Sequence, residues 1–172
     1  MEAPPELVWP WLLQMGDGRG GLYSYDWLEN LVGCNMHSVD RIVPEWQDLK
    51  VGDMVKIMPA GGPSVERMEP GRLLLLSSFV DPKLQSYDRS GPRPAAYIDQ
   101  TWLFALEPVG PGQTRLVTRF RVDYAPPSFF NWLMWKGFTA HGSVIMQRKM
   151  LLGIKERAER LARQSGAGRQ VS

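Results

Sequence analysis

The spacing of hydrophobic residues changes twice along the chain, from helical to alternating and back to helical. Apolar residues between positions 7 and 12 recur at helical spacing, which predicts a short N-terminal helix with one apolar face. A second short helix is predicted over 26–31, because Ser24 or Asp26 can cap its start and Gly33 follows its end.

Alternating or short apolar stretches predict strands in the middle of the chain. These stretches, separated by turns rich in Gly and Pro, are 54–58, 64–68, 73–79, 99–109 and 114–124. The last two flank Gly110-Pro111-Gly112 and therefore predict an antiparallel hairpin with one apolar and one solvated face. The segment 81–96 is rich in Pro, Ser and charge, which is typical of a lid, a binding loop or a plain mobile connection.

After Ser143 the apolar residues return to helical spacing, which predicts a long amphipathic helix ending near Arg163. Residues 164–172 are predicted to form a flexible tail. The predicted apolar stripe consists of Val144, Met146, Met150, Leu151, Ile154, Ala158 and Leu161. Two short helices, antiparallel strands and one long helix predict a single α+β domain over 1–163. A curved sheet around that helix would leave space for an apolar ligand.

Length and charge exclude several classes of protein. A chain of 172 residues suits one domain. Its 20 basic and 18 acidic residues nearly cancel, and the basic surplus after Arg148 lacks interleaved aromatics, so we expect a solvated helix face and no nucleic-acid partner. The acidic, Pro-rich start does not resemble a signal peptide, and the aromatic stretch 129–135 is too short for a membrane span. We therefore expect a cytoplasmic protein with no integral membrane segment.

Candidate chemical groups are few. The lone Cys34 cannot form an intrachain disulfide, and it is either a reactive thiol or a small packed residue. Neither histidine has metal-ligand spacing, so no metal site and no cofactor are expected. The glycines of 16–21 match G-x-G-x-x-G, but they follow a predicted helix rather than a strand. That context favours a structural loop over a nucleotide site.

Aromatic and methionine side chains are abundant, with seven Trp, six Phe and nine Met. Methionine adapts to varied shapes and aromatic rings provide flat apolar walls, so such side chains suit either a ligand cavity or an ordinary core. The candidate ligand-binding residues are Trp27, Trp102, Phe104, Leu106, Phe120, Met146 and Met150. Candidate acids or bases for a reaction in the same cavity are His37, His141, Tyr23 and Tyr25. The alternative for each histidine is a hydrogen-bonded structural role.

Several stretches resemble the polyketide cyclase/dehydrase-like branch of the START/Bet v 1-type helix-grip (SRPBCC) superfamily. They run from Ala3 to about Glu159 and read APPELVWPWLLQMG, RGGLYSYDWLEN, HSVDRIVPEW, VGDMV, TWLFALEP, TRLVTRFR and MLLGIKERAE. The resemblance implies a curved, seven-stranded antiparallel sheet that grips the C-terminal helix around a hydrophobic cavity. It also implies binding of lipid-like or polyketide-like molecules, and some members of the superfamily are enzymes.

One departure from the family affects the expected sheet. The family's first strand precedes the first helix, whereas Met1 stands two residues before Ala3. Either the true start of the chain lies upstream of Met1, or the sheet has six strands and an unpaired edge through which a homodimer could form.

Three functions follow from these patterns. The first is binding of a hydrophobic small molecule between the sheet and the C-terminal helix. The alternative is a cyclase, dehydratase or hydrolase that acts on such a ligand. The third is an interaction module that uses 129–135 as an exposed apolar patch.

Overall fold

The fold combines one antiparallel sheet with a long C-terminal helix. The computed structural model describes residues 1–31, 33–128, 133 and 140–169, with side chains excluded at 140–143 and 166–169. The aromatic stretch 129–135, predicted as an exposed apolar patch, lies outside these residues except for Leu133. The elements are α1 (Pro5–Leu13), α2 (Asp26–Leu31), the 3-10 helix η1 (Pro44–Trp46), β1 (Ser64–Glu69), β2 (Leu73–Val80), β3 (Tyr97–Gly110), β4 (Gln113–Ala125) and α4 (Ala140–Arg169).

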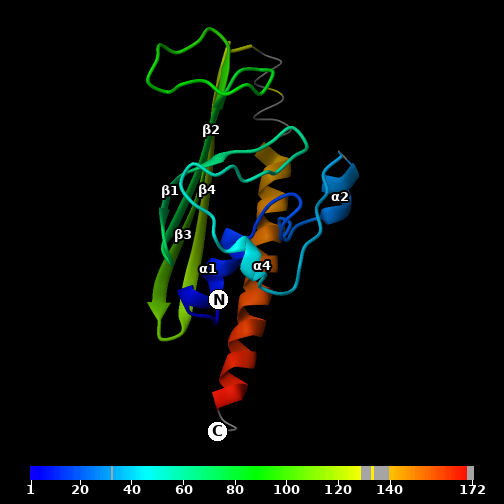
Figure 1. Cartoon of the computed structure of the whole chain (residues 1–172), viewed down its shortest axis with the longest axis vertical. Helices are drawn as coiled ribbons and strands as arrows, with labels where there is room; N and C mark the ends of the chain where they lie inside the picture. Colours follow the sequence, from blue (N-terminus) through cyan, green and yellow to red (C-terminus); the bar gives the residue numbers. More distant parts are fainter. Residues whose placement is uncertain (32, 129–132, 134–139, 170–172) are drawn as a thin grey trace.

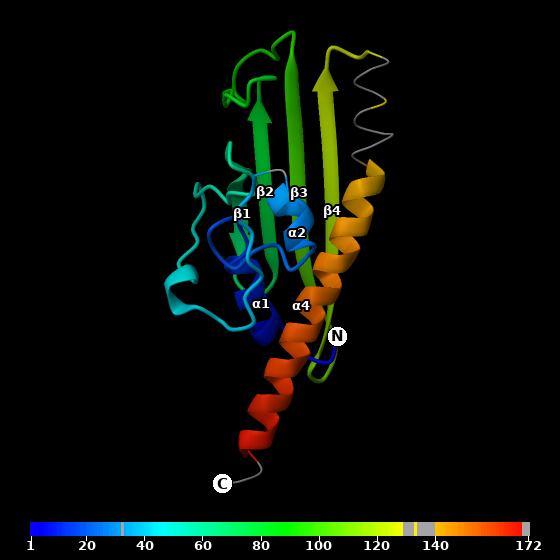
Figure 2. The same ribbon diagram turned by 90° about the vertical axis from the view of Figure 1, so that its right-hand side faces the viewer.

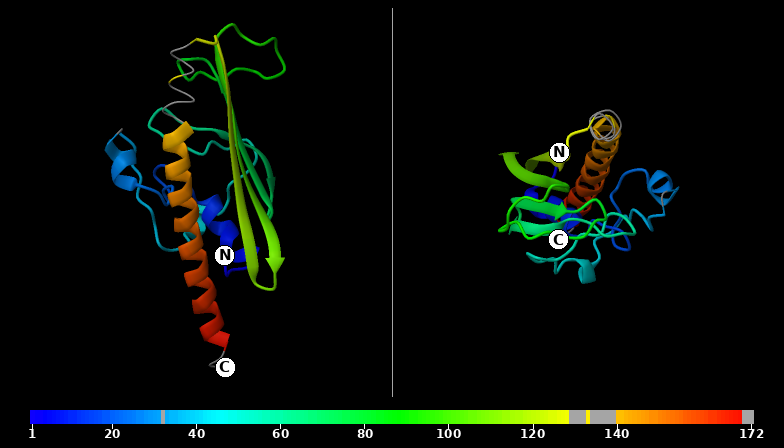
Figure 3. Two further views of the ribbon diagram at one scale, coloured as in Figure 1. Left: turned by 180° about the vertical axis from the view of Figure 1, so that it is seen from behind. Right: turned by 90° about the horizontal axis from the view of Figure 1, so that it is seen from above.

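All described helices lie on one face of the sheet. The strand order is β1-β2-β3-β4, and α4 runs along the sheet with α1 beside its lower half (Figure 1). Turning the molecule shows α1, α2 and α4 together in front of the strands (Figure 2). Seen from above, α2 lies farther from the sheet than α4 does (Figure 3). The predicted α+β class is confirmed.

The inner face of the sheet is set by the strand register. The predicted hairpin of β3 and β4 is confirmed, and β2 pairs with β3 on its other side. Residues opposite one another in an antiparallel pair point to the same face, so each row of partners forms one band across the sheet. Successive bands are Leu74–Phe104–Thr118, Leu76–Trp102–Phe120 and Ser78–Gln100–Val122. The inner face thus changes from apolar to polar along the strands.

The packed core occupies the lower half of the space between sheet and helix. Helix α1 contacts both β3 and α4, and its Val8, Trp11 and Leu12 are almost fully buried. Phe104 of β3 and Ile154 of α4 complete this cluster. Apolar side chains from α1 therefore fill the space between sheet and helix at this level.

The predicted strand 54–58 does not form, so the described residues contain four of the five strands that the hydrophobic pattern predicts. The described sheet also falls short of the six strands expected from the family resemblance. This segment makes only isolated bridges, Met54 with Ser64 and Met58 with Gly61. Pro63 has no N–H to donate to a ladder, and a Cβ on Gly62 would meet the Val55 carbonyl. Close backbone contact at Gly62 and the missing donor at Pro63 disrupt regular pairing.

Helix α4 begins before Ser143 and ends at Arg169 rather than near Arg163. Met150, Ile154 and Ala158 are buried, as their spacing predicts. Val144 is 65% exposed and does not belong to the stripe. It lies two residues before Met146, which turns it about 200° around the helix and away from the core.

Strand β4 forms one edge of the sheet, and the chain's first residue bonds to it. The Met1 ammonium donates to the Thr114 carbonyl at 2.9 Å, and the Thr114 N–H donates to the Met1 carbonyl at 3.1 Å. These two bonds anchor the start of the chain to the strand. A homodimer through this sheet edge stays a prediction.

The glycine-rich segment 16–21 forms a tight loop, as its composition predicts. Gly16, Gly18 and Gly21 have φ angles of 135°, 72° and 75°, which a residue with a Cβ rarely adopts. A Cβ on Gly21 would also lie 2.9 Å from the Ser38 backbone nitrogen. The glycines allow this loop to pack against the segment that follows α2.

Helix α4 approaches the N-terminal segment closely at Gly153. A Cβ at this position would fall on the Tyr23 carbonyl oxygen and lie 2.9 Å from the Tyr23 Cβ. Tyr23 itself has a φ of 56° and donates its hydroxyl proton to the Trp11 carbonyl at 3.0 Å. The Arg157 guanidinium lies over its ring, 4.9 Å from the centroid. Tyr23 thus joins α1 to the middle of α4.

Replacing Gly153 tests this contact. In an open helix Gly→Ala stabilises by about 0.5–1 kcal/mol, but here the added methyl group would push α4 away from Tyr23. We expect Gly153→Ala to lower the free energy of unfolding by about 1–3 kcal/mol, as overpacking usually does. Urea unfolding measures the change, with exposed Glu156→Ala on the same helix as a control. A stabilised Gly153→Ala protein would contradict the close approach.

Candidate functional site

A cavity of about 550 Å³ opens above the packed core, between the sheet, α4 and the N-terminal segment. Trp102 and Phe120 form its wall on the sheet side, and Met146 and Met150 line it from α4. The remaining lining residues come from 22–34, from 57–58 and from the polar band of the sheet. They are Leu22, Ser24, Leu28, Glu29, Cys34, Ile57, Met58, Gln100 and Gln147.

The structure brings together part of the predicted ligand-binding set. Trp102, Phe120, Met146 and Met150 line the cavity, whereas Phe104 and Leu106 do not. Phe104 and Leu106 are buried in the core cluster, because they lie farther along β3 at the level that α1 fills.

Trp27 also lies outside the cavity lining. Its side chain is 69% exposed, and the next residue, Leu28, lines the cavity instead. Adjacent helical residues are about 100° apart around the axis, so the two face different directions.

The predicted acids and bases do not line the cavity, as far as their side chains are described. Tyr23 is buried, and burial raises the pKa of its hydroxyl above the ordinary value. Tyr25 is half-buried, and exposed His37 has its Nε2 3.1 Å from the Asn35 side-chain oxygen. His141 lies in the first turn of α4, and its side chain is outside the described part of the structure.

Glu29 is the titratable carboxyl group of the cavity, and the sequence interpretation missed it. Its side chain is only 4% exposed, and neither carboxyl oxygen accepts a hydrogen bond of regular geometry, although the Ser24 hydroxyl lies near enough to lower the carboxyl pKa. Burial, reinforced by the negative charge of Asp26, raises the pKa of this carboxyl to about 7, while the nearby Ser24 hydroxyl offsets part of the rise. The cavity therefore holds an acid that can ionise near neutral pH.

Short side-chain bonds fix the orientation of α2 and hence of Glu29. The Asp26 carboxylate accepts bonds from the Ser38 N–H and hydroxyl, both at 2.6 Å. Asn30 bonds in both directions with the Met36 backbone, at 2.9 and 2.7 Å. Because these residues precede and follow Glu29 in the helix, they lock the face on which its carboxyl lies.

Cys34 also lines the cavity, where its Sγ lies 3.7 Å from the Ile57 carbonyl. Burial raises the pKa of the thiol, and the charges of Asp17 and Glu29 add to the rise. A raised pKa disfavours the thiolate, which is the nucleophilic form. The packed-residue interpretation of Cys34 therefore fits its surroundings better than the reactive-thiol interpretation.

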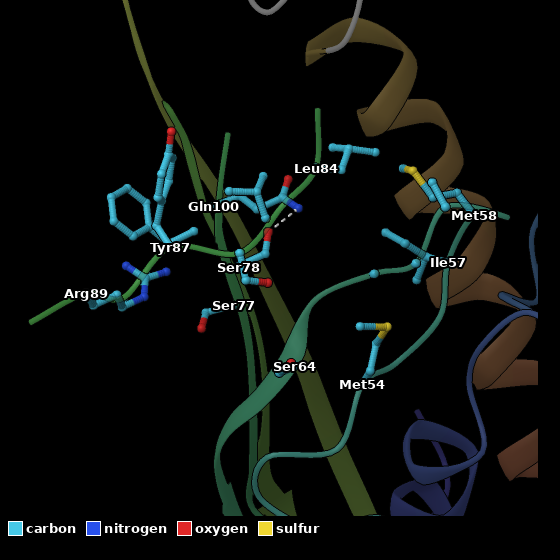
Figure 4. Close-up of a pocket in the computed structure, with 16 residues that line it drawn as sticks. Met54, Ile57, Met58, Ser64, Ser77, Ser78, Leu84, Tyr87, Arg89 and Gln100 are labelled. Carbon is cyan, nitrogen blue, oxygen red and sulfur yellow. Dashed lines mark hydrogen bonds between the residues drawn. The ribbon is translucent and has the colours of Figure 1, made fainter. Parts of the chain in front are cut away.

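A second, smaller cavity of about 290 Å³ shares lining residues with the first, and Figure 4 shows the side chains that line it. Its walls are more polar, with serines from β1 and β2 and with Arg89, whose guanidinium pairs with Asp99 at 2.8 Å. Ile57, Met58 and Gln100 line both cavities. The Gln100 side-chain amide donates to the Ser78 hydroxyl at 2.7 Å, which holds this shared wall in place.

Two further features bear on the kind of site. Among the described residues, no three His, Cys, Asp or Glu side chains are grouped as metal ligands would be. Within the same part of the chain, no helix has both the length and the apolar character needed to cross a membrane.

Burial of the Glu29 carboxyl predicts how the stability of the protein changes with pH. Because the folded state raises the pKa of Glu29 from 4.5 to about 7, the folded protein binds this proton more tightly than the unfolded chain does. Stability is therefore lost as pH rises through this window. Relative to Glu29→Gln, we expect the wild-type free energy of unfolding to fall by roughly 2–3 kcal/mol from pH 5 to pH 8.

Urea unfolding at several pH values measures this difference. Glu66→Gln is the matched control, since Glu66 is an exposed carboxylate on β1. The comparison uses the change in the free energy of unfolding between pH 5 and pH 8. Any cost of burying the glutamine amide is the same at both pH values and therefore cancels. Parallel pH profiles for wild type and Glu29→Gln would show that the carboxyl is not buried as described.

Comparison of the chain with protein-family models, with curated proteins and with solved structures finds no match in any of the three. The resemblance to the helix-grip superfamily therefore stays an expectation drawn from the sequence.

Proposed function

We propose that the protein binds an apolar small molecule in the cavity between the sheet and α4. The observation that carries the proposal is a partly open cavity of about 550 Å³ walled mainly by Trp, Phe, Met, Leu and Ile side chains. Small-molecule sites usually have volumes of about 300–1,000 Å³, apolar walls and a few polar groups. Here Glu29, Ser24 and the two glutamines are the polar groups.

The size of the cavity supports a guest rather than a packing defect. Protein interiors are close-packed, and voids larger than a water molecule are few in each domain. Directly below, α1 fills the space between sheet and α4 with almost fully buried side chains. A fold that packs this tightly at one end and leaves apolar walls apart at the other is typical of a ligand-binding protein.

We extend the proposal to the architecture, as a helix-grip arrangement in which the sheet and α4 hold the ligand between them. The antiparallel order of the strands and the position of α4 on one face support this proposal. The apolar band through Trp102 faces the same space as Met146 and Met150.

A neutral fluorescent probe tests binding. We expect N-phenyl-1-naphthylamine, which carries no charge at neutral pH, to bind one molecule per chain with enhanced emission. Met146→Trp should weaken this binding at least tenfold, because the larger side chain would occupy the cavity. Leu152→Trp is the matched control, since Leu152 is exposed on the same helix.

Fluorescence titration of the full chain measures both variants. Equal affinity in wild type and Met146→Trp would place the probe elsewhere and contradict the proposal. Equal loss in Met146→Trp and Leu152→Trp would contradict it as well, because the effect would then not depend on the cavity.

A second candidate function is acid–base catalysis on the bound molecule, and one observation favours it. Glu29 has a pKa near 7 in an apolar cavity, which suits a group that takes or gives a proton at neutral pH. Incubating the protein with a small-molecule extract of its host cells, followed by mass spectrometry, should reveal a compound that wild type consumes and Glu29→Gln does not. Consumption at the same rate by both proteins, or no consumption by wild type, would contradict this function.

A further inference from the structure

Helix α2 exposes apolar side chains and buries an acidic one, which is the reverse of an ordinary surface helix. Trp27 and Leu31 are 69% and 76% exposed, while Glu29 is 4% exposed. Burying a carboxyl without a hydrogen-bond partner costs free energy, so such groups are rare unless a partner arrives later. The bonds from Asp26 and Asn30 hold the helix in this orientation although it exposes apolar surface.

No described cation faces Glu29. On its own helix the nearest charge is Asp26, which raises the pKa of the Glu29 carboxyl. From the segment after α2 the Cys34 thiol faces it, and α4 contributes the neutral side chains of Met146, Gln147 and Met150 to the same cavity. Lysines and arginines are absent from the described cavity lining. The charged groups at this end of the cavity are therefore acidic.

One basic residue stands near this region, and it is already paired. Lys56 lies 3.1 Å from the carboxylate of Asp17, beyond Cys34. Asp17 is itself buried and also accepts a bond from the Asn35 N–H at 2.8 Å. Because Lys56 already pairs with Asp17, it does not compensate the charge of the Glu29 carboxylate.

The cavity wall across from α2 would accept a cation as well as an apolar body. Trp102 and Phe120 present aromatic rings from the sheet, and aromatic faces attract alkylammonium groups. Met146 and Met150 supply polarizable side chains that adapt to the shape of an apolar guest.

We propose that the ligand is an apolar amine, an alkyl or aromatic body with one protonated nitrogen, and that its ammonium group pairs with the Glu29 carboxylate. This inference rests on the proposed binding function and narrows it to one ligand class. An ammonium supplies both the hydrogen bond and the compensating charge that the buried carboxyl lacks. An alcohol supplies only the hydrogen bond, and a fatty acid brings a second negative charge.

The inference predicts how binding varies with pH. A primary alkylamine keeps its proton throughout, like a lysine with a pKa of about 10.4. Glu29, in contrast, is mostly protonated at pH 5.5 and mostly ionised at pH 8, because its pKa is about 7. We expect amine affinity to rise on the order of tenfold or more over this range, since the ion pair needs the ionised carboxyl.

A displacement experiment on the full chain tests the ligand class. N-phenyl-1-naphthylamine is displaced at pH 8 by decylamine, decanol or decanoate, three ligands with the same chain and different head groups. We expect decylamine to bind at least tenfold more tightly than decanol, and decanoate to bind most weakly. Glu29→Gln should remove the preference for the amine and leave decanol within about threefold of its wild-type affinity, because the apolar contacts remain. Glu66→Gln should keep the wild-type order, since its carboxylate is exposed on β1.

Each outcome separates the inference from the function on which it rests. If decanol or decanoate binds as tightly as decylamine, the amine inference fails while apolar binding stands. If neither the probe nor any competitor binds the wild type, the proposed function fails. If Glu29→Gln does not fold, the wild-type pH series decides, and an amine preference that is equal at pH 5.5 and pH 8 overturns the inference.

Discussion

The cavity depends on the close contact between Tyr23 and the middle of α4. The missing side chain of Gly153 lets the helix backbone reach the Tyr23 carbonyl. The Tyr23 hydroxyl bonds to Trp11 of α1, and Arg157 covers the ring while pairing with Asp40 at 2.9 Å. The N-terminal segment therefore holds α4 at mid-length, α1 fills the space below this point, and the side chains above it line the cavity.

The same segment that fixes α4 also brings an unpaired acid into the interior. Residues 22–34 supply much of the cavity wall opposite the sheet, and α2 is bonded so that Glu29 faces inward. Burial of this carboxyl lowers the stability of the empty protein above neutral pH. A partner that neutralises the charge would restore that stability on binding. The free energy gained by packing α1 in the core thus offsets the cost of burying the Glu29 carboxyl near the cavity.

Local sequence patterns were sufficient for most elements of the fold. Alternation along β3 and β4 predicted the hairpin and its apolar face, and the capping residue and Gly33 predicted α2 with the bounds that the structure shows. The patterns did not predict that 54–58 would fail to pair, because one of the two causes, the close backbone contact at Gly62, appears only when the segments pack together. The hydrophobic periodicity of one segment does not show how that segment packs against another one distant in the sequence.

The site was less accessible to sequence reasoning for a similar reason. The periodicity of β3 placed Trp102 and Phe104 on one face, but only the position of α1 decides that Trp102 lines the cavity and Phe104 the core. In a helix of six residues, Trp27 reads as the buried residue and Glu29 as the exposed one. The bonds of Asp26 and Asn30 reverse that expectation. An acidic residue flanked by two such capping side chains was the available signal.

The wall between the two cavities has a consequence for the size of guest that the protein admits. It consists of side chains from Ile57, Met58 and Gln100, of which the first two stand on a segment with isolated bridges instead of a strand ladder. Such a segment can shift without breaking regular strand pairing. Under the proposed binding function, a shift of Ile57 and Met58 would join the two cavities, and the serine-lined one would then accept the end of a longer guest.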